Sequence, residues 1–224
     1  MSSDPPSSDP GAFIRANTAI GTPPLVPEIK LHLANELTPL WHATEATLEK
    51  SQLPPPYWAF AWPGGQALAR HLLDHPALVA GKSVLDIGAG SGLVSIAASQ
   101  AGATRVTAAE IDGFAIAAIR LNAALNAVSI EAESRDLIGG ESVWDTILVG
   151  DMCYERPLAD RLTAWLRPLA ARGATVLLGD PGRAYLPKDG LREVARYNVP
   201  TSLDLEDRTL RETVIWQLGG TIAI

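Results

Sequence analysis

The residues best suited to chemistry stand in the short segment GDMCYE, residues 150–155, directly after the apolar run TILV. A carboxylate (Asp151), the only thiol of the chain (Cys153) and a phenol (Tyr154) fall within four positions. Such groups serve three kinds of chemistry: nucleophilic attack by a thiolate, coordination of a metal ion, or the binding of a cationic or amine group. The surrounding sequence decides between them.

The thiol and metal interpretations have little support. A lone cysteine is most often a small buried thiol, and no histidine lies close to Cys153 in sequence, although a distant one could still approach it in the fold. The four histidines, His32, His42, His71 and His75, all fall in the N-terminal third. The last two have helical i, i+4 spacing but lack the acid of an H-E-x-x-H motif, so we expect no metal site.

A second group of candidates lies in KSVLDIGAGSG, residues 82–92. Its apolar start predicts a buried strand, and its glycines let the backbone turn tightly and approach a ligand at the start of the next helix. Glu110 ends the next expected strand, where an acid can accept both hydroxyls of a ribose. These features predict a nucleoside cofactor. The alternative that the glycines only close a turn, with Asp86 stabilising the loop, stays open.

The spacing of the glycines does not favour a nicotinamide dinucleotide. That fingerprint places its third glycine three residues after the second, but Leu93 stands there and Gly92 comes one residue early. An acid followed by Gly-x-Gly-x-Gly, here Asp86 and then Gly88, Gly90 and Gly92, resembles the first motif of the class I S-adenosylmethionine methyltransferases. AAEID, which contains Glu110, resembles their acidic second-strand end.

These residues must be positioned by an alternation of helical and strand patterns that begins at residue 66. Such alternation predicts an α/β fold with a mostly parallel sheet covered on both faces, in which ligands bind beyond the carboxyl ends of the strands. The resemblance adds that this Rossmann-like, doubly wound sheet has seven strands. We expect helices over 65–79, 93–102, 114–127 and 158–170, and strands over 82–88, 105–112, 128–136, 143–151 and 173–180.

Along the chain we expect a disordered tail over 1–12, an N-terminal extension over 13–65 that packs on the core, and a methyltransferase core over 66–224, all within a single domain. Prolines predict an extended segment in GTPPLVPEIKLHLA and end a short expected helix in TEATLEKSQLPPP. The first ten residues, MSSDPPSSDP, resemble neither a secretory signal nor a transit peptide, so we expect a cytoplasmic protein.

Composition narrows the function classes. Of 224 residues, 47% are hydrophobic and 19% charged, which is typical of a globular protein, and no apolar run is long enough to span a membrane. A net charge of -7 argues against non-specific binding of nucleic acid, which requires a basic face. A basic partner fits better, and a monomer is favoured, although the sequence does not determine the oligomeric state.

Two further segments sharpen the resemblance. DMCY at 151–154 resembles the D-x-x-Y segment of the seven-strand protein lysine methyltransferases, and the Trp62 of FAWPGG resembles a tryptophan that borders the cofactor in them. With PPYWAFAWPGG upstream and GDPGRAYLP downstream, the nearest resemblance is to the electron-transfer flavoprotein β-subunit lysine methyltransferases, over most of residues 14–218. Tyr57 and Phe60 are expected only to pack. GDPGR is expected to be a turn capped by Asp180, with the alternative that Asp180 or Arg183 lines the substrate mouth.

The resemblance implies S-adenosylmethionine as cofactor and assigns roles to individual residues. Asp151 would hold and orient a lysine amine and Tyr154 would offer its hydroxyl or ring edge, with catalysis resting on positioning. The residues expected to contact the cofactor are Trp62, Asp86, Gly88, Ala89, Gly90, Gly92, Glu110, Asp136, Leu137 and Gly150.

We therefore expect a protein-lysine N-methyltransferase that acts on the electron-transfer flavoprotein β subunit, without a nucleic-acid or membrane partner. One alternative is methylation of ribosomal protein L11 or a small amine. The chain lacks the large N-terminal domain and the Asn-Pro-Pro-Tyr segment of the L11 enzymes, which argues against that substrate. Another is a cofactor-binding module without turnover, which would not need polar groups at the reactive strand end.

Overall fold

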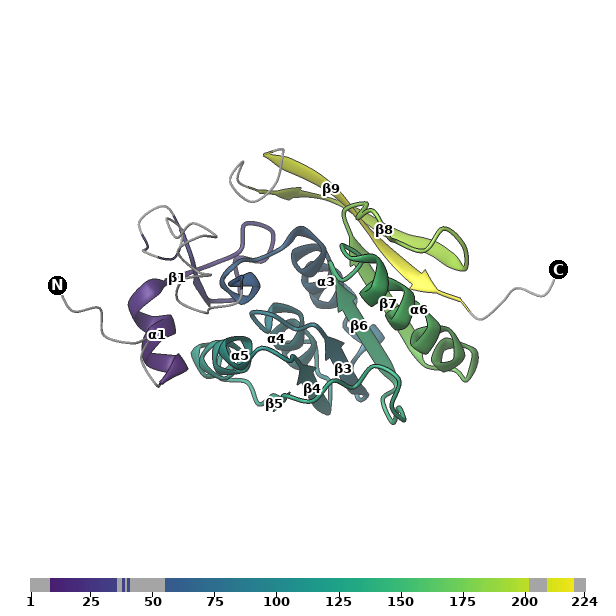
Figure 1. Cartoon of the computed structure of the whole chain (residues 1–224), viewed down its shortest axis with the longest axis horizontal. Helices are drawn as coiled ribbons and strands as arrows, with labels where there is room; N and C mark the ends of the chain where they lie inside the picture. Colours follow the sequence, from purple (N-terminus) through teal and green to yellow (C-terminus); the bar gives the residue numbers. More distant parts are fainter. Residues whose placement is uncertain (1–8, 36–37, 39, 41–54, 202–208, 220–224) are drawn as a thin grey trace.

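The computed structural model describes residues 9–35, 38, 40, 55–201 and 209–219 (Figure 1). Seven strands form one sheet in the order β5-β4-β3-β6-β7-β9-β8, in which the first five are parallel and β9 pairs antiparallel with both β7 and β8. The strands are β3 (Ser83–Ile87), β4 (Arg105–Ala109), β5 (Glu131–Glu133), β6 (Thr146–Gly150), β7 (Thr175–Asp180), β8 (Leu191–Pro200) and β9 (Leu210–Leu218). The predicted α/β class is confirmed.

Strand order reverses between β3 and β6. From β3 the chain builds β4 and β5 on one side and then returns to place β6 on the other side of β3. The loops that follow β3 and β6 therefore separate at their carboxyl ends and leave a crevice, which is where open α/β sheets bind ligands.

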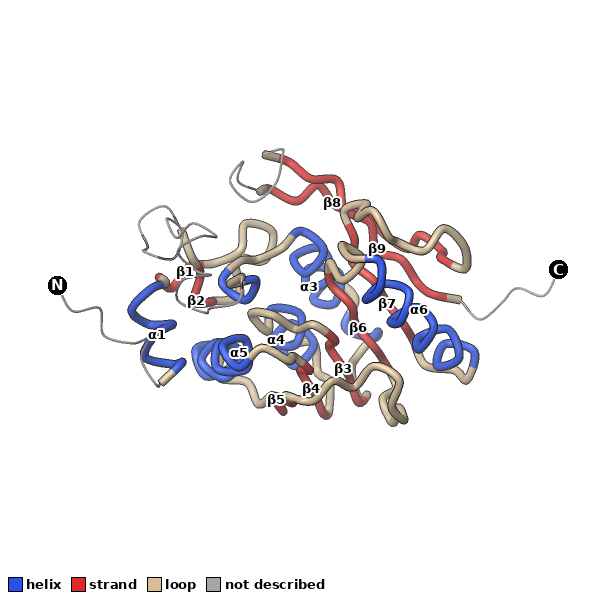
Figure 2. The backbone as a smooth tube through the Cα atoms, viewed as in Figure 1, coloured by secondary structure: helices blue, strands red, loops and turns tan. Residues whose placement is uncertain are grey.

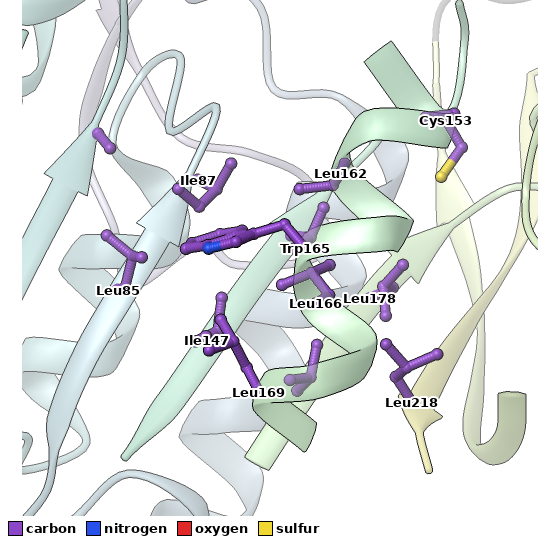
Figure 3. Packing of buried hydrophobic residues seen from close by; sticks show 14 residues of the cluster. Leu85, Ile87, Ile147, Cys153, Leu162, Trp165, Leu166, Leu169, Leu178 and Leu218 are labelled. Atoms are coloured by element: carbon purple, nitrogen blue, oxygen red, sulfur yellow. The ribbon is translucent and has the colours of Figure 1, made fainter. Parts of the chain in front are cut away.

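Helices cover both faces of the sheet (Figure 2). Alternate strand residues face opposite sides, because side chains in a strand have a period of two. Leu85, Ile147 and Leu178 pack with α6 (Arg156–Ala171), as Figure 3 shows around Trp165. Val84, Leu148 and Leu177 pack on the other face with α3 (Pro63–Asp74) and α4 (Leu93–Gln100), and Ala108 packs with α5 (Gly113–Leu125).

The segment before the core packs on α5. It contains α1 (Pro10–Asn17), a two-stranded sheet of β1 (Ala19–Gly21) and β2 (Leu31–Leu33), and the 3-10 helix η1 (Tyr57–Ala59). Trp58 is buried with its ring stacked on Phe114. The buried Asn122 accepts the His32 N–H at 2.8 Å and donates to the Ser91 carbonyl at 2.8 Å, which joins β2 to the loop before α4.

Several boundaries differ from the sequence expectations. Residues 10–12, assigned to the tail, lie in α1, because Asp9 accepts the Gly11 N–H and Pro10 suits the first helical turn. The helix expected from residue 65 begins at Pro63, because proline suits the first helical position. The strand expected over 128–136 is limited to β5, and the extended segment over 21–34 contains turns between its strands. The helix expected in residues 44–56 falls largely on residues outside the described part.

None of the helices in the described part of the chain is long and apolar enough to cross a membrane.

The start of α3 touches the ends of β6 and β7 through glycines. A Cβ at Gly64 would lie 2.1 Å from the Gly179 carbonyl oxygen and 2.5 Å from Asp151 Oδ2. A Cβ at Gly150 would lie 3.2 Å from the Gly65 backbone. Only glycine lets backbones approach so closely. Gly64 and Gly150 therefore determine how near α3 lies to the ends of β6 and β7.

We predict that Gly64→Ala destabilises the protein, while Gly65→Ala does not. Overpacking of the first site costs about 1–3 kcal/mol of unfolding free energy. At Gly65 a Cβ meets nothing closer than Val94 Cγ2 at 3.9 Å, and alanine in a helix gains up to about 1 kcal/mol over glycine. Urea denaturation measures the free energy of unfolding of both variants. Equal values would contradict the close approach of Gly64 to Gly179.

Candidate active site

A cavity of about 480 Å³ lies at the carboxyl ends of the strands, over the point where strand order reverses. Nine of the residues expected to act lie along its wall: Trp62, Gly88, Gly90, Glu110, Asp136, Leu137, Gly150, Asp151 and Tyr154. The fold thus brings together residues from four separate strand ends and from the segment before α3.

Three expected cofactor contacts, Asp86, Ala89 and Gly92, are not among the residues that line the cavity. Asp86 is 1% exposed, and its Oδ2 accepts the Ser95 hydroxyl of α4 at 2.7 Å. Ala89 packs against the cluster formed by Ala108 and α5. Gly92 has a φ of 80° and is the N-cap of α4. These residues support the loop from behind, as in the alternative that the sequence left open for Asp86.

Glu110 presents a fixed carboxylate to the cavity. Its Oε2 accepts the Gly90 N–H at 3.2 Å, and its Oε1 accepts the Ile111 N–H at 2.8 Å. Burial raises the pKa of Glu110, while these backbone hydrogen bonds lower it. Oε1 also accepts the Asp112 N–H at 3.4 Å. The carboxylate is thereby oriented in advance, and Oε2, which has a single backbone donor, keeps a lone pair that can accept a ribose hydroxyl.

Asp151 is the most constrained residue of the site. Its φ of 57° is left-handed, a conformation that costs a non-glycine residue about 1–2 kcal/mol. Its Oδ2 accepts the Gly65 N–H at 3.0 Å, so the carboxylate meets the N-terminus of α3. Burial raises the pKa of Asp151 to about 6, against the lowering effect of Arg183. Such local strain is typical of functional sites.

Arg183 belongs to the site, although the sequence favours a structural turn for GDPGR over a place at the substrate mouth. It lines the cavity, and its Nη2 donates to Asp151 Oδ1 at 2.8 Å. Asp180 accepts the N–H groups of Gly182 and Arg183, each at 2.7 Å, so the predicted turn is confirmed. The turn is part of the site, because it places the Arg183 side chain against Asp151.

Aromatic rings form one wall of the cavity. The rings of Tyr57 and Tyr154 are 5.9 Å apart and those of Tyr57 and Trp62 are 6.0 Å apart. The Trp62 Nε1 donates to the Tyr57 carbonyl at 2.9 Å. Tyr57 is 52% exposed and lines the cavity, so the expectation that it only packs is wrong. Trp58, and not Tyr57, is the buried ring of this segment. The ring centres of Phe60 and Trp62 lie 6.0 Å apart.

The floor and the far end of the cavity add residues without a sequence signal. A Cβ on Gly88 would lie 2.1 Å from Met152 Sδ, so Met152 packs directly on the glycine loop. Asp136 accepts the Arg161 Nη2 at 2.6 Å, which fixes its carboxylate at the other end. Both Met152 and Arg161 line the cavity.

Cys153 and the described histidines, His32, His71 and His75, do not line the cavity. Cys153 is 2% exposed, and burial raises its pKa to about 12, so the prediction of an inert buried thiol is confirmed. Within the described residues no group of His, Cys, Asp and Glu side chains could hold a metal ion. His71 contacts the Tyr197 hydroxyl at 3.0 Å and the His75 ring, away from the cavity.

Known proteins match both this fold and this sequence. Residues 68–149 match the family model described as "Ribosomal protein L11 methyltransferase (PrmA)". The magnesium protoporphyrin IX methyltransferase of Synechocystis PCC 6803, solved with bound S-adenosylmethionine, superposes with a TM-score of 0.52 at 20% identity, over 70% of this chain and 80% of that one. At this identity the likeness shows the fold, which is the Rossmann-like fold of the class I S-adenosylmethionine methyltransferases.

Sequence relatives cover nearly the whole chain. The electron transfer flavoprotein beta subunit lysine methyltransferase of Xenopus laevis is 41% identical, over 92% of this chain and 86% of its own length. The Homo sapiens protein of the same name is 39% identical, over 92% of this chain and 80% of its own length. The chain belongs to this family of protein lysine methyltransferases, as its sequence motifs predicted.

We predict that the cofactor-free protein loses stability between pH 5 and 8 partly because of Asp86. Burial raises the pKa of its carboxyl from 3.8 to about 7, so the folded state binds this proton more tightly than the unfolded chain. The free energy of unfolding therefore falls as pH rises through this range. Asp86→Asn keeps a hydrogen-bond acceptor for Ser95. In urea denaturation this variant should show a smaller fall of the free energy of unfolding over the same pH range.

Asp145→Asn is the matched control. Hydrogen bonds from Ser83 lower the pKa of Asp145, so this group is ionised throughout the range and its removal leaves the slope unchanged. A slope for Asp86→Asn as steep as that of the unmodified protein would contradict the assignment.

Proposed function

We propose that this protein transfers the methyl group of S-adenosylmethionine to a lysine ε-amine of the electron transfer flavoprotein β subunit. The observation that carries the proposal is the buried Asp151 beside exposed aromatic rings, in the cavity that also holds Glu110. The relatives named above support the choice of substrate. The cytoplasmic location and the monomeric state stay predictions from the sequence.

The residues present fit the cofactor. S-adenosylmethionine supplies an electrophilic methyl group on a sulfonium. Glu110 would accept the ribose hydroxyls, Asp136 and Leu137 would border the adenine, and Gly88 and Gly90, with φ of 66° and 51°, would lie along the methionine and ribose portions. Glu110 and Asp151 follow strands on either side of β3, so they lie about 10 Å apart across the sheet. That span suits a nucleoside at one end and its reactive group at the other.

The lysine end of the cavity is built for an amine. A lysine with its ordinary pKa of about 10.4 arrives charged, and it must lose a proton before its lone pair can attack. Asp151 would accept an N–H of the amine and fix its direction. Tyr57, Trp62 and Tyr154 would surround the aliphatic stem and favour a cation through their ring faces. Catalysis then rests on orientation and on exclusion of water.

Ribosomal protein L11 is a second candidate substrate, because residues 68–149 match the family model of its methyltransferase. The matched range contains Glu110 and the glycine loop but ends before Asp151. It therefore covers the proposed cofactor residues and not those proposed to hold the amine.

We predict that Glu110→Gln weakens binding of S-adenosylmethionine. Hydrogen bonds to a charged group contribute about 1.5–3 kcal/mol, which corresponds to roughly a 10- to 100-fold rise in Kd. Glu131→Gln is the control, since Glu131 pairs with Arg105 on the sheet edge outside the cavity. Isothermal titration calorimetry measures both, and an unchanged Kd in Glu110→Gln would refute the ribose contact.

We predict that the protein transfers radiolabel from S-adenosylmethionine to the β subunit of purified electron transfer flavoprotein. Asp151→Asn should lower the rate by about 100-fold or more, since a misdirected nucleophile loses the benefit of positioning. Its cofactor affinity should stay unchanged, and Asp145→Asn should retain full activity. Label on L11 instead would favour the second candidate. Tight cofactor binding with neither protein labelled would contradict the proposal.

A further inference from the structure

Arg183 occupies an unusual position on the cavity wall. Its Nη2 and Nε donate to the same oxygen, Asp151 Oδ1, at 2.8 and 3.2 Å. The two side chains are only 18% and 10% exposed. The guanidinium carbon also lies 5.8 Å from the centre of the Trp62 ring. A permanent positive charge therefore contacts both the Asp151 carboxylate and one ring of the aromatic wall.

The surroundings of Asp151 define its charge balance. From the end of β7, Asp180 adds a second buried carboxylate that raises the pKa of Asp151, and Arg183 lowers it. From α3 the Gly65 N–H donates to the carboxylate, and Gly64 lies against it without a side chain. In its own loop, Cys153 stays a neutral thiol, because burial raises its pKa. Among these groups Arg183 is the one cation that offsets the carboxylate.

A carboxylate without this cation would oppose methyl transfer. Methylation needs the neutral amine, but an isolated buried carboxylate favours the ammonium and raises the pKa of a lysine beside it. A neighbouring guanidinium cancels most of that field. Oδ1 already accepts both N–H groups of Arg183. Oδ2, which accepts the Gly65 N–H, keeps a lone pair that can accept a hydrogen bond from a neutral amine and so orient it.

We propose that Arg183 is a positioning residue for methyl transfer, which neutralises Asp151 so that the carboxylate orients the lysine amine without holding it as an ammonium. This inference rests on the proposed function. Arg183 acts through Asp151 and Trp62 and is itself held by Asp180, which accepts its backbone N–H. The turn after β7 is thus part of the catalytic apparatus.

The test is the pH dependence of kcat from pH 6.5 to 10, with electron transfer flavoprotein as substrate. Removal of the positive charge in Arg183→Gln raises the pKa of the bound amine. The rising limb should then move up by about one pH unit, with kcat roughly tenfold lower at neutral pH and recovered near pH 10. Arg183→Lys, which keeps the charge, should keep the midpoint of the parent protein. Arg183→Met serves as a second neutral variant.

Two results would overturn the inference. A fall in kcat by the same factor at every pH would mean that Arg183 only supports the fold. A lower KM with undiminished kcat at neutral pH would mean that Arg183 instead occupies the place of the substrate lysine and must leave it.

A measurement without substrate separates this inference from the proposed function. Without the guanidinium, the pKa of Asp151 rises. The free energy of unfolding, measured by urea denaturation, should therefore fall more steeply between pH 5 and 8 in Arg183→Gln than in the parent protein. The excess should vanish when Asp151→Asn is also present. Parallel slopes would refute the charge pairing even if another protein proves to be the substrate, whereas failure of the parent protein to label electron transfer flavoprotein would refute only the proposed function.

Discussion

The buried carboxylate of Asp151 is the contact on which the reactive end of this molecule depends. One oxygen accepts the Gly65 N–H at the start of α3, and the other accepts the guanidinium of Arg183 from the turn after β7. The residue itself follows β6 in a left-handed conformation. Three elements distant in sequence are thereby fixed around one group, and the Gly64–Gly179 approach makes the contact sterically feasible.

Three carboxylates at neighbouring strand ends differ in role because their surroundings differ. Asp86 faces α4, is satisfied by Ser95 and supports the glycine loop from behind. Glu110 is oriented by backbone N–H groups and keeps a free lone pair on Oε2. Asp151 is balanced by a cation and lines the same cavity as the aromatic wall. Burial raises the pKa of all three, so the partners of each group decide what it can do.

Much of this arrangement follows from sequence, since apolar runs and helical spacing locate the strands, and strand ends locate Glu110 and Asp151. The sequence leaves two roles open for Asp86, because a glycine loop motif does not show which face of the sheet its acid meets. Tyr57 was misjudged because the exposure of an aromatic ring depends on tertiary neighbours such as Tyr154. The pairing of Arg183 with Asp151 spans 32 residues, and no local pattern encodes such a contact. Sequence thus predicts the positions of strand ends better than the partners of their side chains.

The central claim is that one cavity orients a nucleoside at Glu110 and a methyl acceptor at Asp151. A crystal structure with S-adenosylhomocysteine would test it most directly. The account predicts ribose hydroxyls within hydrogen-bond distance of Glu110 and the sulfur directed toward Asp151 and Tyr154. A ribose away from Glu110, or a sulfur facing away from Asp151, would contradict it.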